Sequence, residues 1–208
     1  MKKILLFSFL ICFVLSVFSQ KNISLPQPKI KGGLPLMETL AKRSTIRSYD
    51  TKALSLQQLS NLLWAAFGVN RADGKRTAPS SNNLQETELF VLLKTGVYKW
   101  EDKENKLLHI SETDVRQYSG KQDYVITAPV QVVLVGNISK MGYGTEEEKI
   151  NTMYIDAGYI SQNIYLYCAS EGLATAVRTS FDRVTLNPML KLKPGQQIIV
   201  IHSVGYPK

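Results

Sequence analysis

The sequence predicts a single α+β domain. The chain of 208 residues is 44% apolar and 20% charged, an ordinary globular composition that excludes disorder and a disulfide-built miniprotein. Short strand-like segments separated by turn residues occupy the middle of the chain, and strongly helical segments precede and follow them. No internal repeat or low-complexity block interrupts this order, so we expect one hydrophobic core.

The first 19 residues have the pattern of a secretory signal peptide. Two lysines precede an apolar run from residue 4 to residue 18, and Ser19 and a polar segment follow it. The run is shorter than the roughly 20 residues that span a bilayer, so cleavage after Ser19 is favoured over an uncleaved anchor. A lipoprotein signal at Cys12 lacks the preceding small residue. We therefore expect an exported protein, periplasmic or secreted, whose mature chain keeps Cys168 alone and has no internal disulfide.

The mature chain begins with residues 20–33, which are rich in proline and glycine and predict an extended arm rather than a packed element. The folded domain is expected to span residues 34–208. A short helix that ends near Arg43 is its first predicted element. The next segment, residues 44–49, is rich in β-branched and hydroxyl residues and is expected to be extended.

A helix that starts at residue 56 has the strongest local signals. Ser55 and Gln58 have the spacing of a capping box, apolar residues then recur at helical intervals, and Gly68 ends the helix. Residues 71–85 after it contain glycine, proline, serine and asparagine clusters, which are typical of a loop.

Strands follow in the centre of the chain. A hairpin meander is predicted from the strands at 87–94, 97–100 and 107–110. A short helix is expected at residues 111–118. The nearly continuous apolar run at 128–135, interrupted by Gln131, predicts a buried central strand.

A long helix is predicted over residues 152–170, and a last strand over residues 197–204. The helix contains Asp156 and two amide residues, so we interpret it as a core or interface helix rather than a membrane span. It mixes small residues with large apolar ones, which suits the packing of two copies across a twofold axis. The residues that suggest this are Ala157, Gly158, Ser161, Ile160 and Ile164.

Missing motifs narrow the chemistry. The sequence has no G-x-G-x-x-G after a strand, no Walker motif and no G-x-S-x-G. His109 and His202 are 93 positions apart, and we interpret them as scaffold residues and Cys168 as a small core residue. The formal charge of +8 is scattered among acidic residues, so no nucleic-acid partner is expected. No metal site and no catalytic side chain are predicted.

Three segments have the residue types of a ligand site. Arg43, Thr45 and Arg47 alternate, so on an extended backbone they point to one side and suit a phosphate monoester, with a solvated basic turn as the alternative. Residues 79–85 are a dense run of short donors and acceptors that could bond a flat heterocycle or cap their own turns. Residues 171–182 leave the long helix and could be an ordinary loop.

In this order the segments resemble the FMN-dependent nitroreductase family. The resemblance covers residues 34–208, and no single motif carries it alone. The motifs are Arg43-x-Thr45-x-Arg47-x-Tyr49, Pro79-Ser80-Ser81-x-Asn83-x-Gln85, Asp156-Ala157-Gly158 with Gln162-Asn163, Gly172-Leu173-Ala174 and Val204-Gly205-Tyr206-Pro207. Segments 62–66 and 74–80 are most similar to the branch that includes azoline-oxidising dehydrogenases of peptide-maturation pathways.

The resemblance implies a nitroreductase-like fold with an antiparallel-rich central sheet flanked by helices, one of them a long dimer-interface helix. It implies a homodimer with two shared FMN sites and a flavoprotein oxidoreductase that acts on a small organic substrate by ping-pong hydride transfer. The flavin would carry the redox step. The alternative is a non-catalytic flavin-binding or protein-interaction module on the same fold.

The same resemblance assigns the cofactor-binding residues by position. The FMN phosphate would be held by Arg43, Ser44, Thr45 and Arg47. The isoalloxazine ring of the partner's flavin would be lined by Pro79, Ser80, Ser81 and Asn83, and the ring would also lie near Thr179 and Ser180. Lys208 is the candidate for the basic contact that many family members have beyond the last strand.

Overall fold

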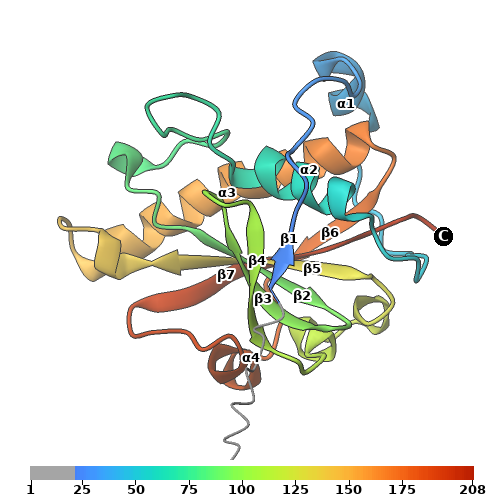
Figure 1. Ribbon diagram of the computed structural model, residues 1–208. Coiled ribbons are helices and arrows are strands. Elements are labelled where there is room, and N and C mark those ends of the chain that lie inside the picture. The colour runs from blue at the N-terminus through green and yellow to red at the C-terminus, as the bar shows by residue number, and fades with distance from the viewer. Residues whose placement is uncertain (1–21) are drawn as a thin grey trace, which may run out of the picture.

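The computed structural model describes residues 22–208, so the expected signal peptide lies outside the described residues (Figure 1). A seven-stranded sheet in the order β1-β4-β3-β2-β5-β7-β6 forms the centre, and every neighbouring pair is antiparallel. The strands are β1 (Ile23–Ser24), β2 (Glu88–Leu93), β3 (Gly96–Glu101), β4 (Lys106–Ser111), β5 (Val130–Asn137), β6 (Ala174–Arg178) and β7 (Gln196–Gly205). The helices are α1 (Leu36–Lys42), α2 (Leu56–Phe67), α3 (Glu146–Ser170) and α4 (Arg183–Met189). The predicted α+β class is confirmed.

Helices cover both faces of the sheet, as Figure 1 shows with α2 and α3 on one side and α4 on the other. The alternation of side chains along β2 explains the two layers. Leu89 and Val91 belong to the core beneath α2 and α3, whereas Phe90 and Leu92 belong to the core beneath α4. The strands are therefore buried on both faces, which accounts for their nearly continuous apolar sequence.

Helix α2 begins and ends where the local signals predict. The Ser55 hydroxyl accepts the Gln58 backbone N–H, and the Gln58 side chain accepts the Ser55 backbone N–H. Gly68 donates its N–H to the carbonyl of Trp64 and ends the helix. The short helix before Arg43 and the central meander are also confirmed.

Helix α3 begins six residues earlier than predicted, since its first residue is Glu146 and not residue 152. A second capping box, formed by Thr145 and Glu148, fixes this start. Three glutamates in the first turn interact favourably with the positive end of the helix dipole.

Strand β6 and helix α4 were not predicted, and the helix expected at residues 111–118 is wrong. Only a 3-10 turn at Arg116–Ser119 forms there. The carboxylate of Asp114 accepts the Arg116 backbone N–H at 3.1 Å and pairs with its guanidinium at 2.8 Å. This local bond offers the backbone an alternative to a helix.

The N-terminal arm is extended, as expected, but its first residues are packed. Strand β1 pairs with β4, and Leu25 is buried. The Asn105 amide donates to the carbonyl of Pro26 at 2.7 Å. These contacts make the arm an edge of the sheet.

The residues that suggested twofold packing of α3 mostly face its own core. Ala157, Ile160 and Ile164 are buried there, and the Ser161 hydroxyl is bonded to His202. The exposed face of α3 instead carries Tyr154, Ile155, Gly158 and Tyr159. No helix within residues 22–208 has the length and apolarity needed to cross a membrane.

Candidate functional site

The arginine-rich segment between α1 and α2 runs beside β6, the edge strand of the sheet. The N–H of Ile46 donates to the carbonyl of Thr175 in β6 at 3.0 Å. Tyr49 forms a bridge with Pro207, and the N–H of Lys208 donates to the carbonyl of Ser48 at 3.4 Å. The segment and the last residue of the chain are thus brought together, as the expected role of Lys208 requires.

Arg43 and Thr45 both contact one residue of α3, Tyr165. The Thr45 hydroxyl lies 3.0 Å from the Tyr165 hydroxyl, and the Arg43 guanidinium carbon lies 5.4 Å from the centre of the ring. Arg47 and Ser44 are exposed. Within residues 22–208, neither Arg43 nor Arg47 pairs with a carboxylate. The segment therefore presents positive charge that no acidic side chain of the described chain neutralises.

The predicted ring-lining loop is held in a strained conformation. Asn82, Asn83 and Gln85 all have left-handed backbone angles, with φ of 48°, 55° and 49°. Such strain persists only where surrounding contacts enforce it. The loop is closed by a bond from the Gln85 N–H to the Ser80 hydroxyl at 3.0 Å, and it is anchored to α3 by a bond from the Ser81 N–H to the Asp156 carboxylate at 2.9 Å.

Two buried carboxyl groups lie beneath this loop. Glu86 is fully buried and Asp156 is 4% exposed. Burial raises the pKa of both groups, and the charge of Asp156 raises that of Glu86 further. One oxygen of Glu86, Oε2, has no hydrogen-bond partner in the described part of the chain. The raised pKa of Glu86 means that it keeps its proton to a higher pH than a glutamate in water does.

Thr179 and Ser180 directly follow β6 and are exposed. The Gln122 amide donates to the Ser180 hydroxyl at 3.0 Å. Arg178, the last residue of β6, points the other way into the fold, where it donates to the hydroxyls of Ser119 and Ser203 at 2.9 and 2.7 Å. Its buried guanidinium fixes the end of β6, from which the Thr179–Ser180 pair projects.

The structure places two of the three predicted groups along one strand, β6. The arginine segment lies beside Thr175 at the start of β6 and the Thr179–Ser180 pair follows its end, about 13 Å further at 3.3 Å per residue. The loop at residues 79–83 is anchored elsewhere. Its partner Asp156 and the arginine segment's partner Tyr165 are nine residues apart on α3, roughly two and a half turns, so they leave α3 on opposite sides.

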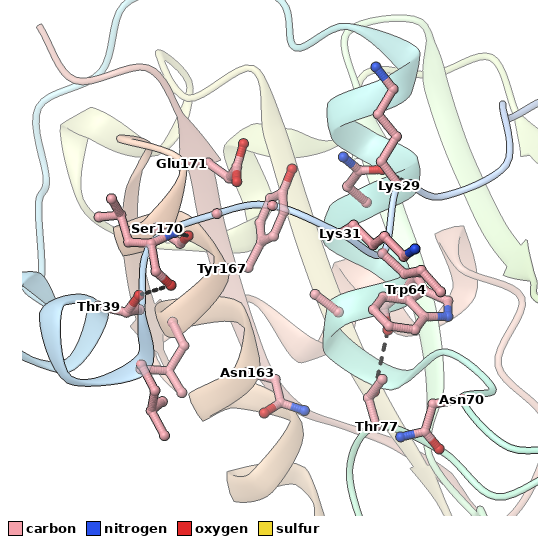
Figure 2. A pocket seen from close by; sticks show the side chains of 18 residues that line it. Lys29, Lys31, Thr39, Trp64, Asn70, Thr77, Asn163, Tyr167, Ser170 and Glu171 are labelled. Atoms are coloured by element: carbon pink, nitrogen blue, oxygen red, sulfur yellow. Dashed lines mark hydrogen bonds between the residues drawn. The ribbon is translucent and has the colours of Figure 1, made fainter.

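A cavity of about 580 Å³ lies between the arm, α2 and α3. Figure 2 shows Trp64 and Thr77 on one wall, Ser170 on the other, and Asn163 and Tyr167 of α3 between them. None of the ten predicted cofactor-binding residues lines this cavity. Thr77, however, is only two residues before Pro79 of the ring-lining loop.

The scaffold interpretation of His202 and Cys168 is confirmed, since both are fully buried. Burial lowers the pKa of His202 to about 3, so its ring is neutral. Its two ring nitrogens bond the hydroxyls of Ser161 at 2.7 Å and Thr175 at 3.1 Å. Burial also raises the pKa of the Cys168 thiol, which makes it unreactive.

Sequence reasoning missed three residues of the site. Tyr165 lies next to the apolar stripe of α3 and has no local signal that marks it. Asp156 was part of a motif without an assigned role, and Glu86 directly follows the predicted loop. Glu86 is followed by Thr87 and by Glu88, the first residue of β2, so no local signal distinguishes it as a buried carboxyl group.

Comparison with known proteins agrees with this fold. The family model described as "Nitroreductase family" matches residues 40–206, most of the chain. The chain belongs to the nitroreductase family. It is 26% identical over 170 residues to "Putative nitroreductase MJ1384" of Methanocaldococcus jannaschii, which covers 77% of this chain and 86% of that protein.

Solved structures of nitroreductases have the same fold. The crystal structure of a "putative nitroreductase" from Ralstonia eutropha JMP134 is 36% identical in sequence, with a TM-score of 0.85. The match covers 92% of this chain and 91% of that one. The Escherichia coli microcin synthetase complex McbBCD is similar in fold at 17% identity, with a TM-score of 0.69 over 88% of this chain and 77% of that one. The nitroreductase-like fold predicted from the sequence is thereby confirmed.

Glu86 predicts a pH dependence of stability. Because its folded pKa is raised above the ordinary 4.5, the folded protein binds the proton more tightly, and stability is lost as pH rises from 4.5 through the raised value. We expect Glu86→Gln to flatten this decline and to raise the unfolding free energy at neutral pH by about 1 kcal/mol or more. The measurement is the unfolding free energy of the wild type and the variant, obtained by urea titration at several pH values between acid and neutral.

The matched control is Glu147→Gln, which changes an exposed glutamate in the first turn of α3. It should change the slope of stability against pH much less than Glu86→Gln does, because an exposed charge at a helix terminus contributes only about 0.3–1 kcal/mol. A Glu86→Gln variant with the wild-type slope would show that folding does not raise the pKa of Glu86.

Proposed function

We propose that this nitroreductase-family protein is an exported FMN-dependent oxidoreductase that acts on a small organic substrate. One observation carries the proposal. Arg43, Thr45 and Arg47 gather at the edge of β6, and no carboxylate of residues 22–208 neutralises the two arginines. Two guanidinium groups and a hydroxyl donor suit a phosphate monoester, which offers several acceptors and about two negative charges.

The residues present fit FMN. Arg43, Thr45 and Arg47 would hold the phosphate, with Ser44 offering backbone contact and Lys208 adding a cation beside Ser48. Thr179 and Ser180, further along β6, would lie near the ring. FMN, when bound, supplies two-electron redox chemistry in two half-reactions, and the protein supplies binding, orientation and electrostatics.

A second copy of the chain would complete each site. Pro79, Ser80, Ser81 and Asn83 lie on the opposite side of α3 from the arginine segment, so within one chain they do not face the same ligand. The exposed face of α3, with Ile155, Gly158 and Tyr159, offers an apolar surface on which a twofold partner would pack. The loop would then line the partner's flavin, which supports a homodimer.

Different observations support the class of substrate and the export of the protein. The cavity beside Thr77 has the size of a site for a small organic molecule, and Trp64 gives it an aromatic wall. Export is supported by the basic and apolar pattern of residues 2–18 followed by Ser19.

The first test concerns the cofactor. FMN should bind the mature protein with a change in flavin fluorescence. Arg47→Ala should weaken binding about tenfold to hundredfold, since a charge-assisted bond of about 1.5–3 kcal/mol is lost. Lys103→Ala, which removes an exposed cation at the β3–β4 turn, is the control and should not change the affinity. Equal FMN affinity for the wild type and Arg47→Ala would show that Arg47 belongs to a solvated basic turn and not to a phosphate site.

The second test concerns the shared site. Ile155 is 58% exposed on α3 and Val184 is 87% exposed on α4 on the other face of the sheet. We expect Ile155→Glu to shift the mass measured by light scattering from two chains toward one and to weaken FMN binding. Val184→Glu should do neither. A wild-type protein that binds FMN as a monomer would contradict the shared site.

The third test concerns the electron donor. Reduced nicotinamides are cytosolic, so an exported enzyme should turn over poorly with NADH or NADPH. Anaerobic stopped-flow of the FMN-loaded protein follows loss of flavin absorbance with each nicotinamide and with dithionite. Reduction by NADH at about 10 per second would match ordinary turnover and contradict this expectation. A dithionite-reduced protein that passes electrons to no quinone or nitroaromatic acceptor would favour a non-catalytic flavin-binding module.

A further inference from the structure

We infer that Tyr165 is a positioning residue that prepares Arg43 and Thr45 for a phosphate monoester. The inference rests on the proposed function and names a side chain that no sequence motif marks. Tyr165 lies on α3, 120 positions from Thr45 in the sequence, and is 8% exposed. It contacts both residues at once, one through its hydroxyl and the other through its ring.

The hydroxyl of Tyr165 orients the proton of Thr45. The backbone N–H of Val177 donates to the Tyr165 oxygen at 3.2 Å, so this oxygen is already an acceptor. Thr45 Oγ1 lies 3.0 Å from the Tyr165 hydroxyl, and either hydroxyl could donate in this bond. In the arrangement that we infer, Tyr165 donates its one proton to Thr45, and Thr45 directs its own proton elsewhere. An ionised phosphate only accepts hydrogen bonds, and a hydroxyl in this state is ready to donate one.

The ring of Tyr165 restrains Arg43. The guanidinium carbon lies 5.4 Å from the ring centre, within the range of a cation–π contact. An arginine that is held in place before the ligand arrives loses less side-chain entropy on binding. Within residues 22–208, the nitrogen donors of Arg43 have no carboxylate partner.

Tyr165 is itself fixed by the core. The edge of its ring meets His202, with centroids 5.2 Å apart and an angle of 74° between the planes. His202 is fully buried, and both of its nitrogens are bonded. One of its partners, Thr175, also accepts the N–H of Ile46 through its carbonyl. The side chains and the backbone of the phosphate segment are therefore tied to the same strand, β6.

This arrangement predicts that loss of the Tyr165 hydroxyl weakens the binding of a flavin only if the flavin carries a phosphate. FMN and riboflavin share the ring and the ribityl chain and differ in the phosphate. Tyr165→Phe keeps the ring contacts with Arg43 and His202 and removes only the hydroxyl. We expect it to weaken FMN binding about fivefold, while riboflavin binding stays unchanged.

The experiment titrates both flavins into the wild type, Tyr165→Phe, Thr45→Val and the double variant, with calorimetry as the readout and circular dichroism to verify folding. Because Tyr165 acts through Thr45, the double variant should lose no more FMN affinity than Thr45→Val alone. Tyr98→Phe is the control. It removes the hydroxyl of a buried tyrosine in β3, four strands away from β6, that donates to the Thr95 hydroxyl. It should change neither affinity.

The outcomes separate the inference from the proposed function. If the wild type binds FMN and Tyr165→Phe keeps the ratio of FMN to riboflavin affinity, or losses in the double variant simply add, the positioning role is overturned and the flavin function stands. If the wild type binds neither flavin, the proposed function is overturned and the inference with it. A fall in the ratio that is absent in Tyr98→Phe supports both.

Discussion

Helix α3 constrains the rest of the structure, because one continuous helix both closes the core and holds the two halves of the candidate site. Its 25 residues run about 37 Å at 1.5 Å per residue. The buried stripe that includes Ile160 and Ile164 fixes the rotation of the helix on the sheet. Once this rotation is set, Asp156 must emerge toward the strained loop and Tyr165 toward the arginine segment. A core substitution that turned the helix would therefore move both halves of the site.

Buried polar groups hold both halves of the candidate site in place. Each is buried at a place where an irregular segment needs an anchor: Asp156 for the loop, Arg178 for the end of β6, and His202 for Tyr165. Burying a charge or an imidazole is costly unless its hydrogen bonds are satisfied. The neutral state of His202 and the raised pKa values of Glu86 and Asp156 show how this cost is limited here. The irregular segments of the candidate site are thus held in place by buried polar groups.

Local signals in the sequence predicted the elements that local bonds determine. The α2 helix was predicted to its ends, since Ser55, Gln58 and Gly68 act within a few residues of one another. Strand β6 was missed because its short apolar run pairs only with β7 and follows a glycine that marks a turn. Helix α4 was missed because Pro188 lies within its seven residues. Of the site, the sequence predicted the ten contact residues by resemblance, and their contacts with FMN remain predictions. It could not show Tyr165 or Glu86, because their partners Thr45 and Asp156 are distant in the sequence and meet them only in the folded chain.

The division of the site across α3 has a thermodynamic consequence for a shared-site homodimer. If the phosphate is held by one chain and the ring is lined by its partner, the bound flavin contacts both chains and binds the dimer better than the monomer. Linkage then requires that flavin stabilise the dimer by the same free energy by which dimer formation improves flavin affinity. In that arrangement the phosphate contacts would all come from one chain, so Arg43, Thr45 and Tyr165 would act in the monomer as well. The loop anchored by Asp156 would act only after assembly, and its strained backbone is held ready before the partner's ligand arrives. In such a dimer the two halves of the site would contribute to binding at different steps, the charged half by attracting the ligand and the loop by forming a rigid wall against the ring.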